Sequence, residues 1–135
     1  MRALSFLTVS TALVAFVLAG CASHEVVSSS GPRPPTTPDQ VTLYQKHPKR
    51  YEQLQLVTLP ITPEMKWNER GDANAAFDAL KAQAAAVGAN GLLLIVNPGE
   101  YEYLVTAGYH GTFYQLPMRR DPKAAVVQAV FVLKK

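Results

Sequence analysis

The sequence predicts an α+β fold in which one helix packs against a mainly antiparallel sheet of five or six strands. Residues 72–87 carry apolar side chains at helical spacing. Short apolar segments bounded by Gly, Pro and Asn lie on both sides of this stretch and are typical of strands. Residues 41–135 are therefore predicted to form a single small α+β domain around one hydrophobic core.

Two strands are predicted before the helix, at residues 41–44 and 54–59. The segment between them, 46–52, is polar and contains a proline, so it is predicted to be a loop. Prolines also end the second strand, and residues 60–72 then lead to the helix. A connection of that length is long for a compact domain.

The helix is predicted to start at Asp72 or Asn74, because either side chain can cap its amino terminus. It runs to about Val87, and Gly88 is a natural stop in a left-handed conformation. Apolar residues at helical spacing form one stripe: Phe77, Leu80, Ala84 and Val87. Residues 92–96 follow after a short turn and are apolar throughout, which predicts a strand buried on both faces.

Three strands are predicted after that buried strand. Residues 101–110 alternate between apolar and polar side chains, which predicts a strand with one apolar face. Residues 112–116 can return as its partner, and 117–123 form a polar loop. Residues 124–133 are apolar on both faces except at Gln128, so this strand is predicted to be central. The sheet face away from the helix is expected to carry half-exposed tyrosines or to meet a partner.

Residues 1–20 are predicted to be a lipoprotein signal peptide. Arg2 gives a basic start, and an apolar run without acidic residues leads to Leu18-Ala19-Gly20-Cys21. These four residues resemble the bacterial lipobox, in which signal peptidase cuts between Gly20 and Cys21 and the cysteine thiol then carries lipid. The alternative is an uncleaved anchor helix, although about 17 apolar residues is the lower limit for spanning a bilayer.

Residues 21–40 are predicted to be the lipidated cysteine and a flexible tether, because Ser, Pro and Thr dominate and can bury little apolar surface. As a flexible coil, this segment would place the domain about 25 Å from the lipid. Cys21 is the single cysteine, so the domain has no intramolecular disulfide and must be stable on its apolar core alone.

The net charge of the mature chain is small. The whole sequence holds 13 basic and 10 acidic residues, and loss of the signal peptide removes Arg2, which leaves a charge of +2. Charges of both signs are interspersed, which argues against a nucleic-acid-binding surface and is typical of a solvated one. The predicted partners are the lipid bilayer, through acylated Cys21, and an envelope protein, with no nucleic acid and no cofactor.

Three aromatic residues are candidate contacts for a protein partner: Trp67, Tyr101 and Tyr103. Trp67 is the only tryptophan, and it is either a binding hot spot or a side chain that folds back over an open end of the core. The tyrosines at 101, 103, 109 and 114 form either a packing cluster on the sheet face or a ligand platform.

No catalytic or metal-binding residue is assigned. The three histidines, at positions 24, 47 and 110, are too far apart in sequence for a metal motif. One alternative is nevertheless a weak metal-binding module in which His110 acts with a carboxylate such as Asp121. A second alternative is an enzyme with a dispersed site near Trp67 and Asp72, where helix N–H groups can bind an anion.

Residues 79–94, ALKAQAAAVGANGLLL, resemble the helix–turn–strand core of small bacterial envelope proteins of the RcsF and YbjQ kind. The resemblance extends over residues 54–96 and implies the same α+β fold. RcsF-like proteins are lipoproteins that report envelope stress, but their disulfides cannot form here because Cys21 is the only cysteine. YbjQ-like proteins are loosely described as binding heavy metals, and this chain lacks the residues for that role. The resemblance therefore implies fold and location only.

The sequence as a whole predicts a lipid-anchored cell-envelope protein with a non-catalytic binding, structural or stress-sensing role. The sorting of bacterial lipoproteins depends on the residues that follow the cysteine. Here these residues are Ala22-Ser23 and not an aspartate. This pattern favours the inner leaflet of the outer membrane, facing the periplasm.

Overall fold

A computed structural model describes residues 25–27, 31–68 and 72–133. The predicted signal peptide, Gly20 and Cys21 lie outside the described residues, so cleavage and lipidation stay predictions. Within the described residues, no helix has both the length and the apolar character needed to cross a bilayer.

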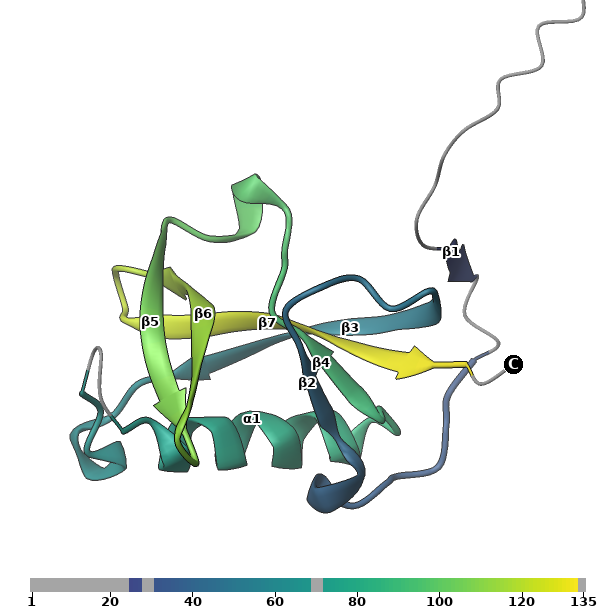
Figure 1. Ribbon diagram of the computed structural model, residues 1–135, viewed down its shortest axis with the longest axis horizontal. Coiled ribbons are helices and arrows are strands. Elements are labelled where there is room, and N and C mark those ends of the chain that lie inside the picture. Colours follow the sequence, from purple (N-terminus) through teal and green to yellow (C-terminus); the bar gives the residue numbers. More distant parts are fainter. Residues whose placement is uncertain (1–24, 28–30, 69–71, 134–135) are drawn as a thin grey trace, which may run out of the picture.

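The predicted α+β fold is confirmed, since one helix packs on an open, mainly antiparallel sheet (Figure 1). The sheet has seven strands rather than the predicted five or six, because residues 25–27 of the predicted tether add a strand to its edge. The helix is α1 (Asn74–Ala86). In chain order the strands are β1 (Glu25–Val27), β2 (Thr42–Tyr44), β3 (Arg50–Pro60), β4 (Gly91–Leu93), β5 (Tyr103–Tyr109), β6 (Thr112–Arg119) and β7 (Ala124–Val132). Single turns of 3-10 helix lie in the connections: η1 (Pro38–Gln40), η2 (Pro63–Met65) and η3 (Pro98–Glu100).

Strand β7 is central, as predicted, because most of its residues are apolar and buried on both faces. On one side it pairs with β3 along nearly its whole length in antiparallel orientation. On the other side its edge is divided, because β4 pairs with residues 128–130 and β6 with residues 124–125. The sheet therefore forks into two arms, β4–β2 and β6–β5 (Figure 1).

Several strand ends differ from the predicted ones. β4 ends at Leu93, its last residue to pair with β7, and β6 extends to Arg119 because it pairs with residues 124–125 further along the same edge. β3 begins at Arg50, inside the predicted loop, because its first residues still pair with β7. β5 begins at Tyr103, so Tyr101 lies in the loop before it. Each difference arises from pairing between segments that are distant in sequence.

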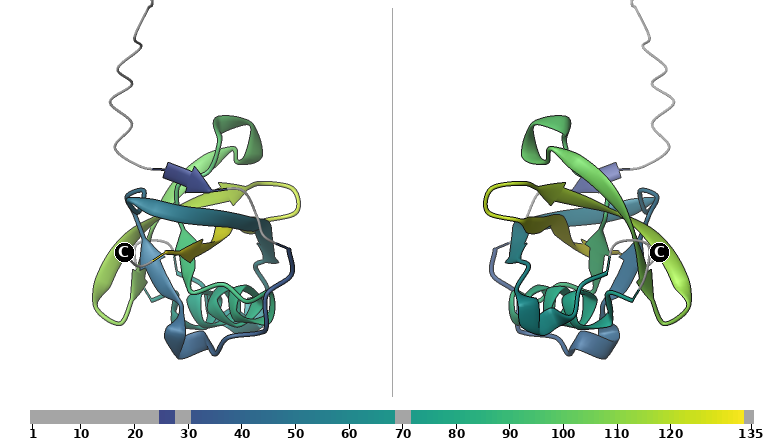
Figure 2. Two further views of the ribbon diagram at one scale, coloured as in Figure 1. Left: turned by 90° about the vertical axis from the view of Figure 1, so that its right-hand side faces the viewer. Right: turned by 90° about the vertical axis from the view of Figure 1, so that its left-hand side faces the viewer.

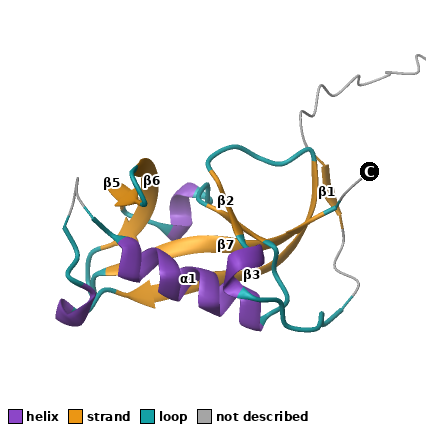
Figure 3. Ribbon diagram, turned by 60° about the horizontal axis from the view of Figure 1, so that its bottom comes forward, coloured by secondary structure: helices purple, strands orange, loops and turns teal. Residues whose placement is uncertain are grey.

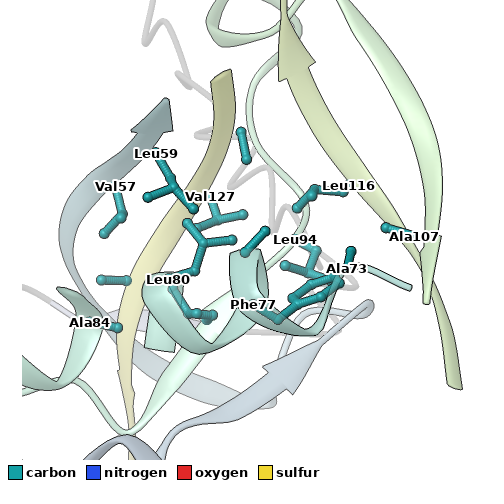
Figure 4. Packing of buried hydrophobic residues seen from close by; sticks show 14 of the residues in the cluster. Val57, Leu59, Ala73, Phe77, Leu80, Ala84, Leu94, Ala107, Leu116 and Val127 are labelled. Carbon is teal, nitrogen blue, oxygen red and sulfur yellow. The ribbon is translucent and has the colours of Figure 1, made fainter. Parts of the chain in front are cut away.

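The main core lies between α1 and the sheet face above it (Figures 2 and 3). The predicted stripe of α1 is confirmed: Phe77, Leu80 and Ala84 are fully buried, and Val87, one residue past the helix, is half-buried. Figure 4 shows Phe77, Leu80 and Ala84 packed against side chains from the sheet and its arms, among them Val57, Leu59, Leu94, Leu116 and Val127.

Both ends of α1 are stabilised close to where the sequence predicts. Ala73 is at the N-cap position, and the Asp72 carboxylate accepts a hydrogen bond from the Asn74 backbone N–H at 2.8 Å. Asp72, which lies one residue before the N-cap, therefore accepts a hydrogen bond from one of the N–H groups at the helix start that have no partner within the helix. At the other end Gly88 has a φ of +83°, which stops the helix as predicted.

Residues 31–41, here called the strap, pack on the domain although the sequence predicts a flexible tether over most of them. The Thr36 N–H donates to the Ala85 oxygen at 2.9 Å, and its hydroxyl donates to the Ala89 oxygen. Carbonyl groups at a helix end need such partners, and composition does not reveal that one threonine in a Pro-rich run supplies them. The described part of the predicted tether therefore belongs to the folded domain.

The strap is also held at Arg33. Its guanidinium forms an ion pair with Glu52 of β3 and lies 3.8 Å from the ring centre of Phe131 on β7. The Glu52 side chain is only 2% exposed. Before the strap, β1 adds to the outer edge of β3 as a parallel strand over residues 50–52.

Gly88 lies where the strap crosses the end of α1. Replacing it with alanine is expected to lower the free energy of unfolding by about 3 kcal/mol. A Cβ there would lie 2.5 Å from the Arg33 Cβ and 2.8 Å from the Pro34 carbonyl oxygen. Gly111→Ala is the matched control, because φ is +82° there and no atom lies within 4 Å of the added Cβ.

The control is expected to cost about 1 kcal/mol, which is the penalty of the left-handed backbone alone. Chemical denaturation of both variants measures the difference. Equal losses would mean that the strap does not pack on the end of α1.

Candidate functional site

Two adjoining hollows open beside the loop that joins the two arms of the sheet. After β4 the chain leaves the sheet, passes through η3 above the sheet face opposite α1, and enters β5 (Figure 1). We call residues 94–102 the arch. The apolar cleft, of about 190 Å³, lies between the arch and the β5–β6 hairpin, and the polar hollow, of about 470 Å³, between the arch and β3, β4 and β7. Ile95, Val96 and Tyr101 line both.

The arch is fixed to β6 mainly through Glu100. Its backbone N–H bonds the Asn97 oxygen at 2.8 Å, which closes the turn of η3. Arg119 donates through Nε to the Glu100 backbone oxygen at 2.9 Å and through Nη2 to its carboxylate at 3.3 Å. The Glu102 N–H then bonds the Met118 oxygen at 2.8 Å. The apolar side chains of the arch are therefore presented by a loop that is bonded to the sheet.

The apolar cleft is lined by six apolar or aromatic residues: Leu94, Ile95, Val96, Tyr101, Leu104 and Pro117. Gln45 and Gln115 complete the lining, and the Gln115 N–H donates to the Gln45 side-chain oxygen at 3.2 Å, which links the two arms. Ile95 is 39% exposed and Leu104 is 50% exposed. Apolar centres with polar margins are typical of protein–protein contact sites.

The polar hollow has an apolar floor that includes Leu56 and Leu93, and five polar side chains line it: His47, Gln53, Asn97, Glu100 and Gln128. His47 Nδ1 lies 3.0 Å from the hydroxyl oxygen of Tyr51, and the two rings stack with centroids 6.1 Å apart. Burial raises the pKa of the Tyr51 phenol. Gln128 donates to the Ala129 oxygen at 3.0 Å. The imidazole of His47 is thus held by Tyr51, and the carboxylate of Glu100 is held by Arg119.

Of the three predicted partner contacts, only Tyr101 lines the two hollows. Tyr103 packs on the core, and the Arg120 guanidinium lies 4.6 Å from its ring centre. Trp67 also packs on the core, with Lys123 Nζ 5.6 Å from its ring. The interpretation in which Trp67 closes an open end of the core is therefore the one the structure favours, and the three residues do not form one surface.

Two of the predicted tyrosines form a packing cluster on the helix side of the sheet. The Phe77 ring lies 5.1 Å from the ring of Tyr109 and 5.5 Å from that of Tyr114, measured between centroids. The Tyr109 hydroxyl donates to the Asp78 carboxylate at 2.7 Å. This corrects the expectation that the tyrosines line the far face of the sheet, because Tyr109 and Tyr114 face α1.

Stability is expected to fall in alkaline solution partly through Tyr109. Burial of the phenol, together with its hydrogen bond to Asp78, raises the pKa of Tyr109 to about 12. Since the unfolded value is about 10, the folded state holds this proton more tightly, and its contribution is full below pH 10 and is lost as the pH rises through 12. The free energy of unfolding of Tyr109→Phe should therefore fall less steeply with rising pH than that of the wild type.

Denaturation curves recorded at a series of pH values up to about 12 measure this slope for both proteins. The raised pKa of Tyr51 contributes equally to both, so it does not affect the comparison. Identical slopes would contradict the assigned role of Tyr109.

The alternative of an enzyme site near Trp67 and Asp72 stays a prediction, because the structure does place a hollow beside Asp72. A hollow of about 340 Å³ lies beside Asp72, between the start of α1 and the β5–β6 turn, and Trp67 does not line it. The Asp72 carboxylate already accepts an N–H at the helix start, so its charge would repel an anion. The Asn74 side-chain oxygen accepts the His110 backbone N–H at 3.0 Å.

The predicted metal pair of His110 and Asp121 is wrong. His110 lies in the turn between β5 and β6, whereas Asp121 lies in the turn between β6 and β7. The eight residues of β6 separate them, which corresponds to about 26 Å. Within the described part of the chain, no three His, Cys, Asp or Glu side chains are grouped so that they could hold a metal ion.

Sequence reasoning missed most of the polar hollow. His47 and Gln53 lie in or beside the predicted loop 46–52, which carries no sign that it borders a concave face. The single signal was Gln128, the polar break in an otherwise apolar central strand, and it lines the hollow. A polar residue inside a buried strand can therefore mark a site.

Comparison with known proteins gives no assignment. No protein-family model, no curated protein and no solved structure matched this chain significantly. The resemblance to RcsF-like and YbjQ-like proteins therefore stays a prediction from the sequence.

Proposed function

We propose that the chain is a lipid-anchored cell-envelope protein whose domain binds a partner protein in the apolar cleft and catalyses no reaction. The anchor is supported by Leu18-Ala19-Gly20-Cys21 at the end of an apolar run. Ala22-Ser23 supports a location on the inner leaflet of the outer membrane, facing the periplasm. In this proposal the acyl chains hold the protein at the bilayer and the cleft holds the partner.

The observation that carries the binding role is the convergence of three partly exposed side chains on one cleft. Ile95 and Tyr101 come from the arch and Leu104 from β5; the Glu100–Arg119 contacts fix the arch to β6, which pairs with β5. A partner that inserts one apolar side chain between them would gain roughly 1.5–3 kcal/mol from its burial. Buried anchors of this kind dominate the energetics of many interfaces.

The cleft can be tested with two matched variants. Leu104→Asp places a charge in the cleft at a side chain that is 50% exposed, so folding should be retained. Phe113→Asp makes a similar change at a side chain that is 59% exposed and lies outside the cleft. Crosslinking in cells followed by purification of the acylated protein should recover a partner with wild type and Phe113→Asp, and at least about tenfold less with Leu104→Asp. Equal recovery with both variants would refute the cleft as the binding site.

The anchor is tested separately by Cys21→Ala. Without the thiol, the protein should not mature and should lose its acyl-dependent association with membranes after fractionation and carbonate washing. If the variant still matures and partitions as wild type does, the anchor is not at Cys21.

A further inference from the structure

We propose that the end of the domain next to the lipid anchor docks directly on anionic phospholipid headgroups. This inference rests on the proposed lipid anchor and adds a second membrane contact. The surface concerned, here called the basic end, consists of Lys46, Lys49 and Arg50 in the β2–β3 loop and at the start of β3. All three side chains are exposed.

The basic end is the place where both termini of the described domain meet. The Glu25 N–H of β1 donates to the Lys49 oxygen at 2.7 Å, and the Leu133 N–H donates to the Arg50 oxygen at 3.0 Å. Figure 2, left, looks onto this end, where β1 and the last residues of β7 pair with opposite edges of β3 at Tyr51.

Charge is distributed unevenly along the molecule. The three basic residues of this end lie beside one acidic residue that contacts them, Glu25, which pairs with Arg50 at 3.8 Å. The rest of the mature chain holds nine basic and nine acidic residues, so this end has a net charge of +2 and the remainder a net charge of zero. Neither Lys46 nor Lys49 forms an ion pair with another described residue.

The anchor brings this charge close to the bilayer. Cys21 precedes Glu25 by four residues, which span at most about 14 Å even when fully extended. The Debye length at physiological ionic strength is about 8 Å, so the basic end would be within reach of the surface potential of an anionic bilayer. A lipid chain together with a basic patch is one of the combinations of two signals that give stable membrane attachment.

Vesicle binding tests this inference without the acyl group. The chain from Ala22 onward keeps every described residue, and the probes are vesicles of phosphatidylcholine alone or mixed with phosphatidylglycerol. Wild type should bind the phosphatidylglycerol vesicles and release in high salt. Lys46→Gln/Lys49→Gln/Arg50→Gln should bind them about 100-fold more weakly, at about fivefold per charge.

The matched control is Lys66→Gln/Arg120→Gln/Lys123→Gln, which removes the same charge at the opposite end of β7. It should bind within about threefold of wild type. Lys46→Gln/Lys49→Gln, which leaves the Arg50–Glu25 ion pair intact, should still lose about 25-fold. Equal binding of wild type to both kinds of vesicle, or an equal loss in the control, would overturn the inference. Because this chain has no Cys21, either result leaves the test of the lipid anchor unaffected.

Discussion

Arg33→Met is expected to lower the free energy of unfolding by about 3 kcal/mol, because it takes the Arg33 guanidinium away from the buried carboxylate of Glu52. The Glu52 side chain is 2% exposed and that of Arg33 is 23% exposed, so water can replace the guanidinium only in part. The variant also removes the contact between the guanidinium and the Phe131 ring. Urea denaturation, with circular dichroism as the signal, measures the loss.

Two further variants separate the buried charge from other causes. Arg33→Met/Glu52→Gln removes both charges and is expected to recover at least about half of the loss, because an uncompensated buried charge costs more than no pair at all. Arg50→Met breaks an ion pair whose side chains are 54% and 68% exposed, so it should cost under about 1 kcal/mol. If the variants at 33 and 50 cost the same, the strap is not held by this ion pair.

Phe77→Ala is expected to cost about 3–5 kcal/mol of stability, the range for removing a large buried aromatic side chain. Phe77 has no exposed surface and packs against the rings of Tyr109 and Tyr114 from the β5–β6 arm. Its loss leaves a cavity between α1 and that arm. The same denaturation measurement gives the value.

Phe113→Ala is the matched control, because the same atoms are removed from a side chain that is 59% exposed. It should change the stability by no more than about 0.5 kcal/mol. A loss at Phe77 no larger than that at Phe113 would contradict the packing of α1 on the β5–β6 arm.

The helix and the central strand could be predicted because their evidence is local. Phe77, Leu80 and Ala84 repeat at helical spacing, and residues 124–133 are apolar on both faces, so a short window of sequence contains the whole signal. The fork of the sheet could not be predicted in this way. It depends on how β4 and β6 divide one edge of β7, and that division is set by pairing between segments far apart in the chain.

The strap shows the limit of composition as evidence. A Ser-, Pro- and Thr-rich run is expected to be flexible because it buries little apolar surface. Here Thr36 forms hydrogen bonds with the end of α1, and Arg33 pairs with Glu52. These polar contacts hold the strap on the domain although it buries little apolar surface. The partner of each contact is at least 19 residues away in sequence, so no local sequence pattern predicts these contacts.

Of the three residues predicted from the sequence to contact a partner, one lines the candidate site. Tyr101 lies in the apolar cleft because β5 starts two residues later and leaves it on the arch. Trp67 and Tyr103 lie elsewhere, each with a basic side chain close to its ring, Lys123 and Arg120 respectively. An aromatic residue that is conspicuous in a sequence can thus be a core residue, and only the tertiary arrangement distinguishes the two roles.

Mass spectrometry of the exported protein tests the central proposal, the lipid anchor, most directly. The account predicts an N-terminal peptide that begins at Cys21 and is heavier by its acyl groups, with no free thiol at that position. A chain that still carries residues 1–20, or a mature form with an unmodified Cys21, would contradict it.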